Sequence, residues 1–274
     1  MVCGAVVLNA AQDMSKPEIK VEYRLNEKGK KVPFMFIDGV LVHESDPAKQ
    51  PQPPVVEPGT CSTQDVPGKP PSDAVVLFDG TQKSIENWSD EKGKKTKWKF
   101  VDGALESVKK AGMIQTKQKF GSCQLHVEWA APTPPKGDGQ KRGNSGVFLQ
   151  DIYEVQVLDC YNNKTYPDGQ TGALYGRAKP LVNACRKPGE WQSYDIIYHR
   201  PLFKAGKVVR RATFTVIHNG VLIQDHVELS GGTCWRGPHA VTDYRPHGDK
   251  GSIKLQDHGN PVRYRNIWVR ELAD

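Results

Sequence analysis

Short runs of alternating apolar and polar residues, separated by Gly, Pro and Asn, make up most of the chain after residue 72. No segment keeps a 3.6-residue period over three helical turns, so strands are expected almost throughout. The sequence His218-Asn219-Gly220-Val221 places Asn-Gly between two apolar runs and predicts a two-residue hairpin, because both central residues of a type I′ turn need positive φ. Many strands without helices predict two packed antiparallel sheets. The expected strands span residues 74–78, 98–101, 104–108, 113–116, 123–129, 147–149, 153–158, 191–198, 212–218, 221–226, 252–256 and 262–270.

The most informative run is 143–159, in which a Gly-Asn-Ser-Gly turn leads into an alternating strand that carries acids and amides. Successive side chains of a strand point to opposite faces, so Glu154 and Gln156 share one face and Val155 and Val157 the other. We expect the valines in the core and the polar pair at one edge of a sugar site. The alternative is a polar face that is merely solvated, which is common in antiparallel strands.

Four parts are expected along the chain. Residues 1–12 resemble the end of a truncated export signal that lacks its charged beginning, and a short strand is the alternative. Residues 13–46 predict a small β-hairpin appendage around a lysine-rich turn. Prolines dominate 47–72 and predict an extended linker on or beside the main domain, because each removes a backbone donor and fixes φ. Residues 73–274 are expected to form one sugar-active domain.

Charge and cysteine spacing argue against several classes of binding partner and motif. The net charge is +7, but the basic residues form short clusters such as 92–97 without interleaved aromatics, so no nucleic-acid partner is expected. No apolar run approaches the roughly 20 residues that a membrane-spanning helix needs.

The six cysteines contain no C-x-x-C pair, which argues against a zinc ribbon or a redox motif. Cys160 and Cys185 flank a Gly- and Tyr-rich loop and either form a disulfide or are small buried residues. The oligomeric state is left open.

Eight short motifs follow one another in fixed order along residues 74–272. They are Leu77-Phe78-Asp79-Gly80, Gly143-Asn144-Ser145-Gly146, Tyr153-Glu154-Val155-Gln156-Val157-Leu158-Asp159, Thr171-Gly172-Ala173-Leu174-Tyr175-Gly176, Gly189-Glu190-Trp191-Gln192, His218-Asn219-Gly220, Leu255-Gln256-Asp257-His258-Gly259 and Arg265-Asn266-Ile267. This ordered set resembles the bacterial 3-keto-disaccharide hydrolase domain family. The resemblance implies a concanavalin-like jelly-roll β-sandwich whose concave sheet holds a sugar, in a secreted or periplasmic hydrolase that acts on 3-keto-glycosides or 3-keto-disaccharides.

A keto-sugar can be cleaved with one base and an oxyanion clamp. A ketone at C3 makes the C2 proton removable, so a base can form an enolate that expels the C1 substituent, after which water adds. Glu154 and His258 are the candidate bases. Arg265, Gln156 and Asn144 are the candidate donors to the enolate oxygen. His258 could instead be a turn residue, and Arg265 could instead pair with an acid, Glu154 or Asp159.

Two other functions remain open at this point. The run from Glu154 to Asp159 is similar to the acidic strand of retaining glucanases, which predicts a retaining O-glycosidase if a bulge brings both acids to one face. A non-catalytic, lectin-like carbohydrate-binding module is the other alternative. The remaining candidate sugar contacts are Tyr175, Asn183, Gln256, Trp235 and Tyr244.

No ligand spacing predicts a metal site, and no cofactor is expected with certainty. Asp249, Asp257, His239 and His247 could still gather calcium or another divalent cation after folding. The whole interpretation depends on one geometric condition. Folding must bring the Glu154 strand and the stretch that carries His258 and Arg265 around one hollow.

Overall fold

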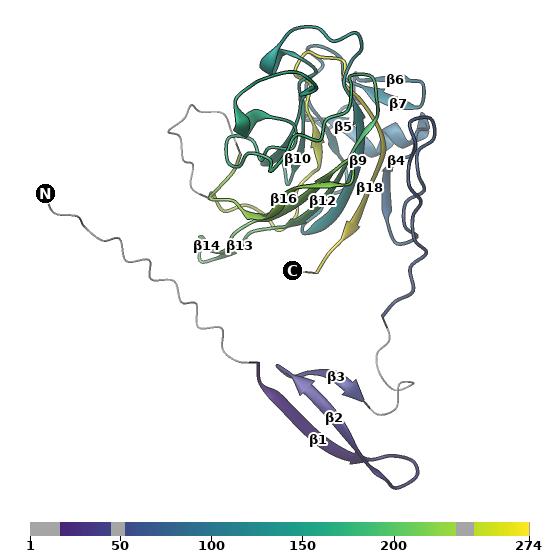
Figure 1. The fold of residues 1–274 in the computed structure, drawn as a ribbon, viewed down its shortest axis with the longest axis vertical. Helices are drawn as coiled ribbons and strands as arrows, with labels where there is room; N and C mark the ends of the chain where they lie inside the picture. The colour runs from purple at the N-terminus through teal and green to yellow at the C-terminus, as the bar shows by residue number, and fades with distance from the viewer. Residues whose placement is uncertain (1–16, 45–52, 234–243, 274) are drawn as a thin grey trace, which may run out of the picture. The chain divides into compact units, whose positions relative to one another are not determined.

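The structure, a computed structural model, describes residues 17–44, 53–233 and 244–273. The chain forms two compact units, Met1–Val55 and Val56–Asp274. The described part of the first unit is a three-stranded antiparallel sheet of β1 (Ile19–Leu25), β2 (Lys31–Ile37) and β3 (Val40–Glu44), where a hairpin was expected (Figure 1). The expected export segment 1–12 lies outside the described residues.

Two antiparallel sheets packed face to face form the second unit (Figure 1). The larger sheet contains, in spatial order, β16 (Val221–Glu228), β15 (Thr213–His218), β12 (Gln192–His199), β9 (Cys123–Ala130), β18 (Arg263–Glu271), β7 (Ala104–Glu106) and β6 (Lys99–Val101), with β4 (Val75–Phe78) paired to β18. The smaller sheet contains β11 (Tyr153–Val157), β10 (Ser145–Leu149), β17 (Lys254–Leu255), β8 (Ile114–Thr116) and β5 (Trp88–Asp90). The all-β, concanavalin-like jelly-roll fold is therefore confirmed.

The remaining elements of the second unit are short. A two-stranded ribbon joins β13 (Leu202–Lys204) to β14 (Lys207–Arg210), and single 3₁₀ turns occur at η2 (Lys83–Asn87), η3 (Gly139–Lys141) and η4 (Pro167–Gly169). In the described part of the chain, no helix has the length and apolar character needed to span a membrane.

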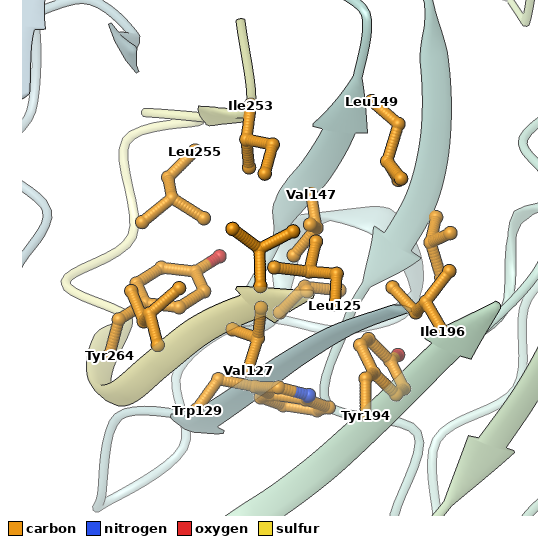
Figure 2. Close-up of a cluster of buried hydrophobic side chains, with 14 of the residues drawn as sticks. Leu125, Val127, Trp129, Val147, Leu149, Tyr194, Ile196, Ile253, Leu255 and Tyr264 are labelled. Carbon is orange, nitrogen blue, oxygen red and sulfur yellow. The ribbon is translucent and has the colours of Figure 1, made fainter. Parts of the chain in front are cut away.

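Apolar side chains from the facing sides of the two sheets form the core (Figure 2). Leu125, Val127 and Trp129 of β9 are fully buried against residues of the smaller sheet such as Val147 and Leu149 of β10. Burying each such side chain contributes roughly 1.5–3 kcal/mol, so this layer fixes how the two sheets face each other. It thereby also decides which side chains of β10 and β11 point away from the core.

The predicted hairpin at 218–221 is confirmed. His218 pairs with Val221 across the turn, and Asn219 and Gly220 have φ values of 53° and 81°. Those are the positive values that a type I′ turn requires.

The proline-rich segment does not behave as one linker. Residues 57–72, called the strap below, fold back on themselves: the Thr60 N–H donates to the Lys69 carbonyl (2.9 Å) and the Ser72 N–H donates to the Glu57 carbonyl (3.1 Å). The tip of the strap contacts β9 and β18 through Ser62, Thr63 and Gln64. The second compact unit accordingly begins at Val56, before the strap, instead of at residue 73.

The four cysteines in the described residues, Cys61, Cys123, Cys160 and Cys185, are free thiols. Cys160 and Cys185 are nevertheless neighbours, because their side chains are hydrogen-bonded to each other. The Cys185 thiol also lies 3.2 Å from the Thr171 hydroxyl. The pair thus joins the loop after β11 to the loop before β12.

Candidate active site

The face of the smaller sheet that is turned away from the core carries the candidate site. β10 and β11 pair in continuous register, with Gly146 opposite Gln156 and Phe148 opposite Glu154. Val155 and Val157 are fully buried in the core, so Glu154 and Gln156 share the other face, as predicted. Both are buried instead of solvated, with exposed fractions of 5% and 1%. The solvated alternative is therefore excluded, because other parts of the chain cover this polar face.

The Glu154 carboxyl lies over Gly146. A Cβ atom at residue 146 would be only 2.3 Å from Glu154 Oε1, so the carboxyl uses space that any side chain there would fill. The Gln156 amide, in the orientation that satisfies its neighbours, donates to the Ser145 carbonyl (2.7 Å) and to Glu154 Oε1 (3.3 Å). The Glu154 backbone N–H donates to the Thr233 hydroxyl at 2.7 Å. These contacts hold the carboxyl in place without neutralising it.

Burial raises the pKa of Glu154 to about 8. The cause is the loss of hydration of the charged form, and no cation in the described part of the chain offsets it. A carboxyl with a pKa near the working pH can both take and return a proton, which is the property of a general acid/base. Perturbation of this kind, at a residue among polar groups, marks Glu154 as the centre of the candidate site.

Amide and hydroxyl groups from the loops around β11 surround this carboxyl. Gln140 on η3 donates to the Thr165 hydroxyl (3.0 Å) and the Gly169 carbonyl (2.8 Å), and its Oε1 lies 3.1 Å from the Gln156 amide. The Tyr166 and Tyr175 hydroxyls are 2.6 Å apart. Burial raises the pKa of Tyr175, and the charge of Glu154 adds to that effect. The tyrosine pair and the carboxyl therefore belong to one cluster.

Sequence reasoning did not single out Gln140, Tyr166 or Thr233. All three lie in loops rich in Gly and Pro, outside any alternating strand, and no spacing distinguishes them from ordinary loop residues. The available signal for Gln140 and Tyr166 was their closeness in sequence to the Gly-rich motifs at 143–146 and 171–176, and Thr233 has no such signal.

Asn144 and Gln256 lie on or beside the same face. The Asn144 side chain donates to the Gln140 carbonyl at 2.7 Å and its backbone N–H donates to Asn260 at 2.7 Å. The Gln256 backbone N–H donates to the Gly146 carbonyl at 3.0 Å, and the Gln256 side chain is half-buried. Both residues frame the site, and the Asn144 amide is engaged by the protein.

His258 is exposed in the loop that follows β17. The neighbouring Asp257 carboxylate shapes this loop by accepting from the Gly259 N–H (2.8 Å) and the Gly112 N–H (3.2 Å). The contacts of the described residues do not join His258 to Glu154. The assignment of His258 as a base stays a prediction, and Glu154 is the candidate that the geometry favours.

The expectation that Arg265 lies beside Glu154 is wrong. Arg265 follows Tyr264, whose hydroxyl reaches Ser145 between the sheets at 2.6 Å, and Arg265 therefore points to the far face of the larger sheet. Its Nε donates to the Glu128 carboxylate (2.7 Å), and its other nitrogens donate to the carbonyls of the strap. The alternative prediction, an ion pair of Arg265 with Glu154 or Asp159, is also wrong, because Arg265 pairs with Glu128. One hollow lined by Glu154 and Arg265 does not exist.

Asp159 is also placed differently from the retaining-glycosidase prediction. The β10–β11 register has no bulge, and Asp159 lies beyond the end of β11. Its carboxylate forms an ion pair with Arg142 (2.9 Å) and accepts from the Tyr161 N–H (3.1 Å). Asp159 is therefore an anchor for the loop after β11, and the structure does not bring it to the face of Glu154.

Two further candidate sugar contacts have structural roles. Asn183 donates to the Cys160 carbonyl (2.9 Å) and accepts from the Cys185 N–H (3.0 Å), which fixes a loop. The Tyr244 hydroxyl accepts from the Ala212 N–H and donates to the Leu229 carbonyl, both at 2.8 Å. Trp235 lies outside the described residues.

The candidate metal ligands are engaged elsewhere. Asp249 pairs with Arg200 (2.6 Å), Asp257 binds backbone N–H groups, and His247 lies 2.8 Å from the Tyr153 hydroxyl. His239 is outside the described residues. Within the described ranges, no three His, Cys, Asp or Glu side chains are grouped so that they could hold a metal ion.

A jelly-roll sandwich with a buried, protonatable carboxyl among amides and hydroxyls on one sheet defines a carbohydrate-active protein of the glycosyl-hydrolase-like class. The model of the 3-keto-alpha-glucoside-1,2-lyase-like domain family matches residues 73–270 of the chain, so the chain belongs to this family. The resemblance inferred from the motifs is thereby confirmed.

Individual relatives agree with this assignment. The chain is 25% identical over 244 residues to a 3-keto-disaccharide hydrolase of Bacteroides thetaiotaomicron, covering 72% of this chain and 78% of that protein. It is 49% identical to a candidate glycosyl hydrolase of Parabacteroides distasonis, with a TM-score of 0.77 over 85% of this chain and 98% of the other. A second Parabacteroides distasonis structure is 20% identical, with a TM-score of 0.54 over 73% and 94% of the two chains, and shares the fold.

Proposed function

We propose that the protein cleaves 3-keto-glycosides, including 3-keto-disaccharides, by elimination at C1/C2 followed by hydration, with Glu154 as the base. The observation that carries this proposal is the buried Glu154 carboxyl, whose pKa is raised to about 8, on β11 within the residues that the family model matches. Its neighbours are neutral donors and acceptors, which suit a neutral sugar.

The chemistry needs a single proton carrier. Glu154 takes the C2 proton, whose electrons move toward the C3 ketone to give an enolate, and collapse of the enolate expels the C1 oxygen of the aglycone. The protonated carboxyl holds that proton at neutral pH because its pKa is raised, so it can return it to the leaving oxygen. Water then adds at C1 of the enone and C2 regains a proton. The sum is hydrolysis of the glycosidic bond.

Neutral donors around Glu154 are suited to the developing enolate oxygen. The Gln156 amide already lies beside the carboxyl, and the Tyr166–Tyr175 hydroxyl pair belongs to the same cluster. A donor aimed at a developing oxyanion is worth on the order of 10²–10³ in rate. Gln156, Tyr166 and Tyr175 are the residues to which we assign that role, in place of Arg265.

The test is release of 3-keto-glucose from a 3-keto-glucoside. We expect wild-type turnover and a loss of about 10²–10⁴ in kcat/KM for Glu154→Gln, the range that a positioned base contributes. Because the base must be ionised, kcat/KM should rise with pH up to about 8 and level off above it. Asp159→Asn is the comparison variant: loss of unmodified-glucoside hydrolysis in both variants would instead support a retaining glycosidase. Saturable sugar binding without any turnover would support a lectin-like module.

A further inference from the structure

A second hollow lies on the far face of the larger sheet, beneath the strap. It has a volume of about 500 Å³, and its walls include His126, Trp191, Gln192, Ser193, Asp195 and Trp268. These residues come from β9, β12, β18 and the loop before β12. Glu154 belongs to the other sheet, on the face that points the opposite way, so this hollow is separate from the candidate active site.

The floor of the hollow is a tightly paired group of charges. The Glu128 carboxylate accepts hydrogen bonds from Arg265 and Asn266, both at 2.7 Å, and from the Ser62 hydroxyl of the strap. Burial alone would raise the pKa of Glu128, but these bonds and His126 outweigh it and lower the pKa to about 2. Glu128 is thus a permanent anion whose partners are all supplied by the protein. It stiffens the floor and is not free to bind a ligand.

One group of the lining does have unused capacity. The Asp195 side chain is 37% exposed and contacts His126 through Oδ1 at 2.7 Å, which leaves Oδ2 without a described partner. The Gln192 amide does not add a donor, because Gln192 alternates with Ser193 and points to the core side of β12, where its Oε1 lies 2.9 Å from His218 Nε2. One acceptor is therefore available at the hollow.

Two indole rings complete the hollow. The Trp268 ring is stacked on His126 with ring centres 5.0 Å apart, and the Arg265 guanidinium lies 4.3 Å from the centre of the Trp191 ring. Each ring is held by a cationic neighbour on one side, which fixes its orientation. Rigid aromatic walls combined with a few polar groups are characteristic of small-molecule sites of this size.

We propose that this hollow is a second carbohydrate-binding site, which takes a neutral mono- or disaccharide and does no chemistry on it. A sugar ring offers a C–H face to the indoles and hydroxyl donors to Asp195. The lining holds two acids, Glu128 and Asp195, beside two cations, Lys69 and Arg186, so a strongly charged ligand of either sign gains little there. The site would hold saccharide on the face opposite Glu154, independently of turnover.

The experiment is a calorimetric titration of the folded Glu154→Gln protein with trehalose and with maltose. Ser193 and Ile197 alternate with buried residues on the same face of β12, and of the two only Ser193 lines the hollow. Ser193→Phe fills the hollow, and Ile197→Phe is the matched control on the same strand. We expect saturable binding of one or both sugars, weakened at least tenfold by Ser193→Phe and unchanged by Ile197→Phe. Asp195→Asn, which keeps the shape, should weaken binding as well.

Either of two binding results would overturn the proposal: no saccharide binding by the parent protein, or equal binding in the Ser193→Phe and parent proteins. Turnover separates this site from the active site. With Glu154 intact, Ser193→Phe should cleave a 3-keto-glucoside within about twofold of the wild-type kcat/KM. A large loss of turnover in a folded Ser193→Phe protein would mean that the hollow belongs to the catalytic site, which also contradicts the proposal. Failure of the Glu154 mechanism would appear in turnover alone and leave the binding result unaffected.

Discussion

The Glu154 carboxyl occupies space that exists because residue 146 is glycine. Its neighbours in the described structure are an amide, hydroxyls and backbone, and none carries a positive charge. An ionised carboxylate in such surroundings is costly, because burial removes water without supplying a counter-charge. The fold therefore stores a destabilising group at the place where a proton carrier is needed.

The cost of Glu154 should be measurable as a function of pH. Its pKa is raised from 4.5 to about 8 on folding, so the folded state keeps a proton that the unfolded state loses. Stability from this group is complete below about pH 4.5 and falls by about 1.4 kcal/mol per pH unit until about pH 8. Urea unfolding of wild type and Glu154→Gln at pH 5 and pH 8.5 should show the wild type losing more. Parallel losses in both proteins would contradict the raised pKa.

Gly146→Ala should separate catalysis from stability. The new methyl group would lie 2.3 Å from Glu154 Oε1, so the carboxyl must move, while the backbone can stay as it is. We expect kcat/KM on a 3-keto-glucoside to fall at least tenfold, with a change in the free energy of unfolding below about 2 kcal/mol, within the ordinary range for point substitutions. Gly248→Ala, whose nearest neighbouring atom is 3.7 Å away, is the control and should change neither value.

At the level of single residues, simple alternation predicted the shared face of Glu154 and Gln156 because β11 is regular. Alternation does not hold around Arg265. Asn266 has a φ of 46° and the β18 register shifts between Arg265 and Trp268, so Arg265 and Asn266 both point away from the core. A bulge changes the sheet face to which every residue beyond it points. No feature of the local sequence predicts the bulge in β18. The neighbours of Glu154 other than Gln156 could not be predicted either, since Gln140, Tyr166 and Thr233 lie outside the strands.

At the level of elements, the bulge in β18 and the strap together enclose the buried Glu128 carboxylate. The bulge turns Arg265 and Asn266 toward Glu128, and the polar tip of the strap closes over all three. The prolines predicted an extended segment, but its attachment depends on long-range contacts that composition does not encode. The Arg265 guanidinium, which binds Glu128 and two strap carbonyls at once, is the central connection.

Arg265→Met should therefore act on stability and leave the chemistry intact. Removing one partner of a buried ion pair typically costs about 3–5 kcal/mol, because the other charge stays buried. Arg263→Met on the same strand is the control: Arg263 is 39% exposed, and loss of its pair with Glu106 should cost less than about 1 kcal/mol. Urea unfolding measures both. Loss of turnover in folded Arg265→Met protein would place Arg265 in the active site and contradict its assigned position.

His126, which contacts Glu128, makes the free energy of unfolding depend on pH. Burial lowers the pKa of His126, but hydrogen bonds to Asp195 and Glu128 outweigh it and raise the pKa to about 9. Since the folded pKa exceeds the unfolded value of 6.5, the stability that His126 adds is complete below about pH 6.5 and is lost as pH rises through about 9. His126→Gln should remove this trend from unfolding free energies measured between pH 6 and pH 9.5. An unchanged trend would mean that His126 is not the titrating group.

At the level of the whole molecule, the second compact unit begins at Val56 and includes the strap. A protein that starts at Val56 should keep its melting temperature and its keto-glycoside turnover. A protein that starts at Asp73 lacks the strap and exposes the Glu128–Arg265 pair, so its melting temperature should fall by several degrees. Equal melting temperatures for the two truncated proteins would show that the strap contributes nothing to the folded unit.

The family and the sandwich could be inferred from ordered motifs and strand spacing, because both are properties of the whole chain. The division of the polar groups into two sites, one on each sheet, depends on how the strands pair across the molecule. It separates a proposed catalytic site around Glu154 from the Glu128–Arg265 centre.

The most direct measurement is the fate of the C2 hydrogen of a 3-keto-glucoside cleaved in D₂O. At early times, before free 3-keto-glucose exchanges on its own, elimination and hydration through Glu154 predict one deuterium at C2 in the product of the wild-type protein. Glu154→Gln should cleave the substrate and exchange its C2 hydrogen about 10²–10⁴ times more slowly than the wild type. Product that keeps hydrogen at C2, or full activity in Glu154→Gln, would contradict the account.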